Sequence, residues 1–329
     1  MRLARFVATV AAGLGMLWVT TPPGSADDPE AGFPAVAAHE FTVGQERLAA
    51  AVQCDSGARS GRPTVLLIPG TGGTPDEIWS WNYEKALPAV GYGWCTVDLP
   101  DRALGDFAVS AEYAAYAAMQ AHRVSGRPIG IVGHSQGGAM AAWIAKFWPQ
   151  VAAVTSDVIP IAGPLGGSAV ADSLCAGGAC APIAWQMGTR SHVTRAFANA
   201  PVPDGPAFTS IQTVQDELVL PQPQAGSMRG GRTIMVQQVC PGHLADHGML
   251  VFDPVAYALV LDALGHPGPA DPSRVDRSVC GQATLPGFDP AGYTTFTNTV
   301  SALMFGLLDT RNWVPAEKPL PVYAELYDR

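Results

Sequence analysis

The sequence predicts an α/β fold with a mostly parallel sheet and helices on both faces. Short apolar runs rich in β-branched residues alternate along the chain with longer segments whose apolar residues recur at helical spacing. Strands and helices that alternate in this way form a parallel sheet covered on both sides. One strand–helix pair is joined by Gly133-His134-Ser135-Gln136-Gly137, with glycine two residues before and two after the serine. That arrangement indicates a nucleophile elbow, a tight turn that lifts a serine hydroxyl clear of the sheet.

The predicted strands are short apolar runs bounded by turn-forming residues, at 64–68, 93–98, 128–132, 151–161, 208–214 and 233–239. The predicted helices cover residues 83–89, 110–123, 138–148 and 254–264. Ser110 is expected to cap the second helix, because a serine oxygen accepts a hydrogen bond from the free N–H groups of a helix start.

Two segments depart from this alternation. Residues 163–206 are rich in Gly, Ala and Pro, and we expect them to cross the carboxyl edge of the sheet, where such folds bind ligands. Residues 281–329 form a Pro-containing tail with one apolar stretch at 300–308. The predicted division is one α/β domain at 27–280, which includes the covering segment 163–206, and a C-terminal extension that packs near the site entrance.

Composition narrows the function. Apolar residues make up 48% of the chain and charged residues 14%, which excludes disorder over most of its length. The net charge is −9 and no block of Lys and Arg occurs, so nucleic acid is not an expected partner.

The N-terminus has the pattern of a secretory signal peptide. Arg2 and Arg5 precede an apolar stretch at 6–19, and Gly24-Ser25-Ala26 offers a cleavage site, so residues 1–26 are expected to be removed. The alternative is a membrane anchor, but this apolar stretch is short for a bilayer. No other segment is expected to cross a membrane, and the protein is predicted to be secreted.

Six cysteines in an exported chain are expected to form disulfides, and their spacing leaves fifteen pairings open. They are Cys54, Cys95, Cys175, Cys180, Cys240 and Cys280. None has zinc-site spacing, so no metal is expected. A Gly-rich turn at 69–73 lacks the Lys-Ser/Thr of a phosphate-binding loop, and no cofactor is expected.

A serine hydroxyl needs a histidine base, and that histidine needs a carboxylate to hold its tautomer. Elbow hydrolases carry these residues in the order serine, acid, histidine, each after a strand. Asp216 is the first carboxylate after the strand at 208–214, and the adjacent Glu217 is expected to point elsewhere. His243 and His247 follow the last predicted strand, and His247 lies on the segment that leads into the last helix.

Four segments of the chain resemble those of a known family. Its landmarks are Leu66–Gly72 (LLIPGTG), Ser135-Gln136-Gly137-Gly138, Asp216-Glu217 followed by Pro221-Gln222, and Val239-Cys240 followed by Asp246-His247. From about Cys54 to Cys280 the sequence is similar to the secreted serine lipases of the α/β-hydrolase fold typified by Candida antarctica lipase B.

The resemblance implies Ser135 as nucleophile, Asp216 as acid and His247 as base. It implies Thr71 and the backbone N–H of Gln136 as oxyanion-hole donors. It also implies the disulfides Cys54–Cys95 and Cys240–Cys280, beside which Cys175–Cys180 would be an additional local bridge.

The sequence departs from that family in the expected substrate pocket. His134 stands where the lipase has a Trp at the floor of its alcohol pocket, Met187 replaces a Gln, and Ile161-Ala162-Gly163 stands in place of an Asp. Leu218 and Val219 are candidates for the acyl-binding wall.

These residues predict acyl transfer by a secreted lipase or carboxylesterase that acts on lipophilic esters, with triacylglycerols as one substrate class. A short-chain esterase, a cutinase-like polyesterase and a thioesterase remain open, since all form the same acyl-enzyme. The rival from another class is a catalytically silent binding protein with a hydrolase fold. The expected partner is a lipid or ester substrate, with transient contact to a lipid interface, and the expected oligomeric state is monomeric.

Overall fold

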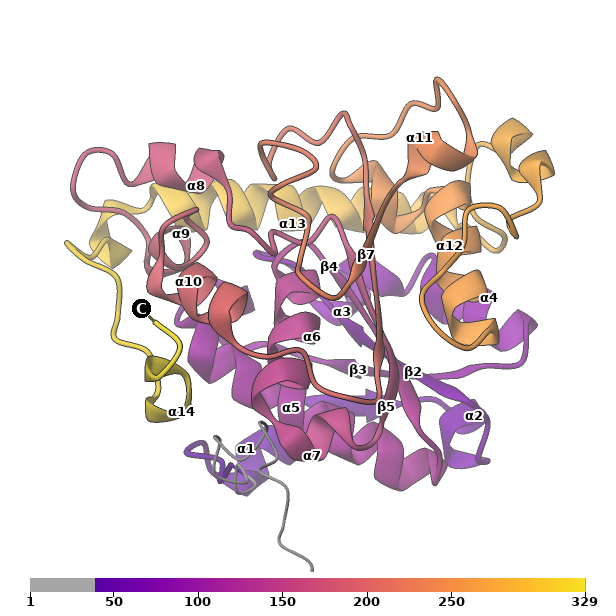
Figure 1. Ribbon diagram of the computed structural model, residues 1–329, viewed down its shortest axis with the longest axis horizontal. Coiled ribbons are helices and arrows are strands. Elements are labelled where there is room, and N and C mark those ends of the chain that lie inside the picture. Colours follow the sequence, from indigo (N-terminus) through magenta and orange to yellow (C-terminus); the bar gives the residue numbers. More distant parts are fainter. Residues whose placement is uncertain (1–38, 329) are drawn as a thin grey trace, which may run out of the picture. The chain divides into compact units, whose positions relative to one another are not determined.

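The computed structural model describes residues 39–328, so the signal peptide predicted at 1–26 lies outside the described residues. Within them lies a seven-stranded sheet with the order β1-β3-β2-β4-β5-β6-β7 (Figure 1). β1 pairs antiparallel with β3 and every other pair is parallel, so the predicted mostly parallel sheet is confirmed. The strands are β1 Val52–Cys54, β2 Thr64–Ile68, β3 Gly93–Val97, β4 Ile129–His134, β5 Thr155–Ile161, β6 Ala207–Gln212 and β7 Arg232–Met235.

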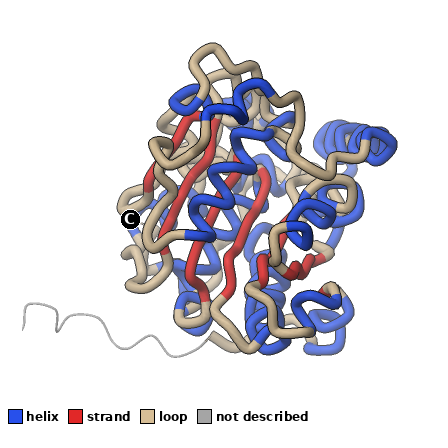
Figure 2. The backbone as a smooth tube through the Cα atoms, turned by 90° about the vertical axis from the view of Figure 1, so that its right-hand side faces the viewer, coloured by secondary structure: helices blue, strands red, loops and turns tan. Residues whose placement is uncertain are grey.

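Helices cover both faces of the sheet, as expected (Figure 2). The longer ones are α4 Tyr83–Ala89, α5 Phe107–Ser125, α6 Gln136–Phe147, α10 His192–Asn199, α12 Pro254–Gly265 and α13 Pro290–Leu308. The shorter ones are α1 Gln45–Ala50, α2 Ser56–Arg59, α3 Pro75–Trp79, α7 Pro149–Ala152, α8 Ala169–Leu174, α9 Pro182–Gln186, α11 Val236–Val239 and α14 Val322–Glu325. None of the helices described in residues 39–328 is long and apolar enough to cross a membrane.

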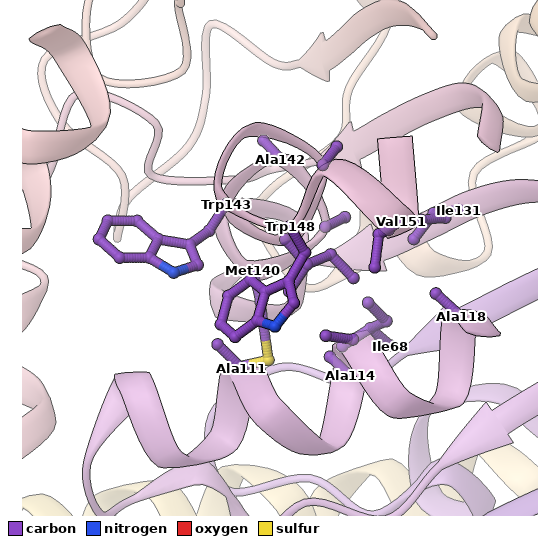
Figure 3. Close-up of a cluster of buried hydrophobic side chains, with 14 of the residues drawn as sticks. Ile68, Ala111, Ala114, Ala118, Ile131, Met140, Ala142, Trp143, Trp148 and Val151 are labelled. Atoms are coloured by element: carbon purple, nitrogen blue, oxygen red, sulfur yellow. The ribbon is translucent and has the colours of Figure 1, made fainter. Parts of the chain in front are cut away.

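The alternating side chains of β2 explain why helices are needed on both sides. All five residues of β2 are buried. Leu66 and Ile68 belong to the core shared with α5, α6 and α7, whereas Val65 and Leu67 belong to the core shared with α4 and α12. Successive strand residues point to opposite faces, so a fully apolar strand requires cover on both. Figure 3 shows the first core, where Met140 and Trp148 lie close to Ala111 and Ala114 of α5.

Three predicted details of the elements are wrong. α5 begins at Phe107 and is capped by Asp106, whose side chain accepts the N–H of Ala108, so Ser110 lies inside the first turn. The run at 151–161 starts with the end of α7, because Pro149 opens a short helix before β5. The run at 233–239 divides into β7 and α11, so β-branched composition alone overestimated both strands.

The covering segment 163–206 carries α8, α9 and α10, and the tail is fastened to it. Cys180 forms an isolated β-bridge with Val314, and Trp185 donates its indole N–H to the carbonyl of Val314 at 3.0 Å. Near the end of the chain, Asp328 accepts a hydrogen bond from Arg195 of α10 at 2.8 Å. The structure forms the disulfides Cys54–Cys95, Cys175–Cys180 and Cys240–Cys280.

Candidate active site

Ser135 occupies a strained turn between β4 and α6. Its φ of 55° lies in the left-handed region, which residues with a side chain rarely adopt. A Cβ on Gly133 would lie 2.1 Å from the carbonyl oxygen of Gly137, and a Cβ on Gly137 would lie 2.4 Å from that of Ile68. Both contacts are with backbone, so only glycine fits at these two positions. The glycine spacing seen in the sequence is therefore a consequence of strand and helix nearly touching at this turn.

The loops after β6 and β7 bring Asp216 to His247. The two oxygens of the Asp216 carboxylate lie 3.1 and 3.0 Å from Nδ1 of His247, and both side chains are buried. Parallel strands end at the same edge of the sheet, and these loops and the elbow all lie at that edge. Asp216 is placed to hold His247 in the tautomer whose Nε2 is free to accept a proton.

The charge of Asp216 is preserved by its hydrogen bonds. Burial alone would raise the pKa of this carboxyl, but the hydrogen bond from His247 and those from the backbone N–H groups of Val219 and Leu218 lower it below its ordinary value. The two backbone bonds measure 2.7 and 2.9 Å. The carboxylate therefore remains ionised, as an orienting and charge-stabilising partner of a histidine must.

Three polar side chains join the two loops, and of these the sequence had drawn attention only to Glu217, as the carboxylate beside Asp216. Thr213 donates its hydroxyl to the carbonyl of Ala245 at 2.7 Å, and Gln215 accepts the N–H of Ala245 at 2.8 Å. Glu217 accepts the N–H of His247 at 3.1 Å, so it binds the backbone of the histidine while Asp216 binds the imidazole. Polar residues are common in loops, and nothing in the sequence pattern distinguished Thr213 and Gln215 from solvated residues.

Thr71 and Gln136 meet beside the elbow. The Thr71 hydroxyl donates to the side-chain oxygen of Gln136 at 2.5 Å. Gln136 is the first residue of α6, so its backbone N–H has no acceptor within the helix. Neither this N–H nor that of Thr71 donates to a backbone or side-chain acceptor among residues 39–328. Two unpaired N–H groups and a helix N-terminus can stabilise a developing negative charge.

The candidate catalytic residues open onto a cavity of about 420 Å³. Its floor includes Ser135 and His247, and its walls come from the covering segment, the Asp216 loop and α13. The pocket residues expected from the sequence, His134, Met187, Leu218 and Val219, all line it. Most of the lining is aliphatic, as shown by Leu174, Ile183, Val300, Leu303, Met304 and Leu307. The tail that was expected near the entrance supplies one wall through α13, which crosses the upper part of Figure 1.

Known proteins resemble this chain in sequence and in fold. No family model matches the sequence. Lipase B of Pseudozyma antarctica is 29% identical over 212 residues, which cover 61% of this chain and 61% of that protein. The crystal structure of Aspergillus fumigatus lipase B has a TM-score of 0.77 at 26% identity, and the match covers 93% of this chain and 76% of that one. The chain has the α/β-hydrolase fold and is similar to lipase B. It matches less than two thirds of the length of the Pseudozyma antarctica protein.

His134 occupies the position at which the similar lipase has a Trp. Its Nε2 lies 3.1 Å from the carbonyl oxygen of His247, and the two imidazole rings are 5.0 Å apart. Burial, and next the nearby His247, lower the pKa of His134 from 6.5 to about 3. A neutral His134 donates its Nε2–H to that carbonyl, so it fastens the backbone of His247 to β4 without adding a charge.

The pKa of His134 predicts acid sensitivity of the fold. The unfolded chain takes up a proton at this residue near pH 6.5 and the folded chain only near pH 3, so stability is present above pH 6.5 and is lost as pH falls. The expected loss is about 1.4 kcal/mol per pH unit within that window. His134→Gln keeps an N–H donor but does not titrate. Urea unfolding at pH 7.5 and pH 4.5 should show a smaller pH effect in this variant, and equal effects would contradict the assignment.

Proposed function

We propose that this protein is a serine hydrolase that cleaves carboxylic esters of lipophilic substrates and acts outside the cell. The observation that carries the proposal is that Ser135, in its strained elbow, lines the same aliphatic cavity as His247, which is held by Asp216. The similarity to two proteins titled lipase B supports the same reaction. Three disulfides support an oxidising compartment, in agreement with the predicted signal peptide.

The proposed mechanism is acyl transfer in two stages. His247 accepts the hydroxyl proton while Ser135 attacks the ester carbonyl carbon, and Asp216 stabilises the resulting imidazolium. The N–H groups of Thr71 and Gln136 donate to the carbonyl oxygen as it becomes negative. The C–O bond to the alcohol then breaks, and the alcohol leaves with the proton from His247. Water repeats the same steps on the acyl-enzyme and releases the acid.

The Thr71 hydroxyl requires one adjustment in this mechanism. Its single proton is directed at the side-chain oxygen of Gln136. To serve as a third donor, it must rotate from that oxygen toward the oxyanion, whereas the two backbone N–H groups need no rearrangement. We therefore assign the principal stabilisation to the backbone groups.

The substrate class is inferred from the entrance. α13 contains no charged residue, and its residues Val300, Met304, Phe305 and Leu308 are exposed, with Phe305 exposed at 77% of its surface. Exposed apolar surface of this kind beside a binding site is typical of an interaction surface. We propose that it contacts a lipid interface transiently while the cavity takes up one lipid chain.

The test compares soluble p-nitrophenyl butyrate with emulsified long-chain triacylglycerol. Hydrolysis of both supports a lipase, and hydrolysis of the butyrate alone replaces that assignment with a short-chain esterase. If the wild-type protein hydrolyses neither these nor longer p-nitrophenyl esters above the buffer rate, the silent binding protein becomes the better description.

A further inference from the structure

Arg102 holds the loop that carries Thr71. The backbone N–H of Gly72 donates to the carbonyl of Arg102 at 2.8 Å, and Nε of Arg102 donates to the carbonyl of Gly72 at 2.8 Å. Both backbone polar groups of Gly72 are thus bound by one residue. Because Thr71 directly precedes Gly72, the direction of its N–H depends on this attachment.

The turn that presents Arg102 is strained. Asp101, Arg102 and Ala103 have φ values of 51°, 54° and 57°, so three consecutive non-glycine residues lie in the left-handed region. Such conformations persist only where the surrounding structure fixes them, and they are concentrated near functional sites. This strained turn is the one that binds the neighbouring loop through Gly72.

Glu77 connects Arg102 to the entrance helix. Its Oε2 accepts hydrogen bonds from the Arg102 guanidinium, from the N–H of Thr74 at 3.3 Å and from the hydroxyl of Thr299 at 3.0 Å. Thr299 is the one residue of α13 that is buried. A single carboxylate oxygen therefore joins α13 to the turn that holds the Thr71 loop.

α13 also lies directly against the loop that carries Thr71 and against the residue that follows the strained turn. A Cβ on Gly72 would lie 2.8 Å from the backbone nitrogen of Leu303, and a Cβ on Gly306 would lie 2.4 Å from Leu104, next to the strained turn. α13 therefore packs directly against the loop that carries Thr71 and against Leu104 beside the turn. Van der Waals contacts and hydrogen bonds thus connect the same three elements, which are α13, the strained turn at 101–103 and the loop that carries Thr71.

We infer that Thr299, Glu77 and Arg102 form a positioning relay that couples the seating of α13 to the direction of the Thr71 N–H. None of the three is assigned a chemical step. The inference rests on the proposed function, because it assigns the purpose of the relay to the oxyanion hole. When α13 is seated against the substrate, the relay holds the donor in the orientation that the tetrahedral intermediate requires.

Thr299→Val removes the hydroxyl without changing the shape of the side chain. We expect kcat on soluble p-nitrophenyl butyrate to fall about 10-fold or more, with KM within about twofold, because a small misplacement of a catalytic group is costly. Thr299→Ser should recover most of the lost kcat. Thr297→Val is the matched control on the same helix, since the exposed Thr297 hydroxyl bonds only to the carbonyl of Thr294 in its own helix. Assays run well below the melting temperature of each variant separate positioning from stability.

Two further measurements make the test specific to the oxyanion hole. An alkylboronic acid forms a tetrahedral adduct with the serine, so its Ki should rise in Thr299→Val by the same factor as kcat falls, while the Ki of hexanol should not change. Glu77→Gln keeps an oxygen acceptor and Glu77→Leu does not, so kcat should fall more in the second.

An unchanged kcat in folded Thr299→Val and Glu77→Leu, or a rise in the hexanol Ki that matches the loss, would overturn the relay. The proposed function fails separately, through a wild-type protein that does not hydrolyse esters.

Discussion

Replacing Ser135 by Ala is expected to lower kcat on p-nitrophenyl butyrate by about 10⁶-fold, which is the size of effect seen when a serine hydrolase loses its nucleophile. The change removes one oxygen atom from a turn whose glycines already accommodate it, so the fold should persist. Steady-state kinetics and circular dichroism check the two expectations. A fluorophosphonate probe, which reacts with activated serines, should label the wild-type protein at Ser135 and leave the variant unlabelled.

Ser156→Ala is the matched control for this substitution. Ser156 is exposed near the start of β5, at the opposite end of the sheet from Ser135, and its hydroxyl donates to the carbonyl of Ile129 at 3.2 Å. It should keep wild-type kinetics and probe labelling. If Ser135→Ala retained substantial activity, the nucleophile would have to be another residue and the proposed mechanism would be wrong.

The second large effect is expected for Asp216→Asn, with kcat lower by about 10⁴-fold and the fold retained. An Asn can still accept the backbone N–H groups of Leu218 and Val219, which stabilise the loop. Its amide would donate to Nδ1 of His247 and so favour the tautomer whose Nε2 carries a proton, which cannot accept one from Ser135. The stability of the variant follows from urea unfolding and its kcat from the butyrate assay.

Glu217→Gln distinguishes the two adjacent carboxylates. Glu217 accepts only the backbone N–H of His247, and Gln can accept the same bond, so the expected loss in kcat is much smaller than for Asp216→Asn. The reverse order, with Glu217→Gln inactive and Asp216→Asn active, would transfer the role of the acid to Glu217.

The sequence predicted those parts of the structure that depend on local pattern. β2 and α4 have the predicted bounds, because the apolar run of β2 is uninterrupted and the side chain of Asn82 caps the start of α4. The order of Ser135, Asp216 and His247 and their positions after strands predicted that they would lie at one edge of the sheet, since parallel strands bring such positions together. Boundaries failed where a cap or a short helix decided them, as at Asp106 and Val236.

The supporting contacts could not be predicted, because they join residues far apart in the chain. Thr299 and Glu77 are separated by 222 positions, and Glu217 and His247 by 30. The left-handed turn at Arg102 carries no glycine that would have marked it. The sequence shows periodicity and turn-forming residues, but it does not show which distant residue a polar side chain will bind.

The attachment of the tail has a consequence for a shortened form of the chain. Ser135, Asp216 and His247 all precede α13 in the chain. One cavity wall is supplied by α13, Val314 pairs with Cys180, and Asp328 accepts a hydrogen bond from Arg195 of α10. A chain truncated before α13 would thus keep Ser135, Asp216 and His247 but lose this cavity wall and these two attachments of the covering segment.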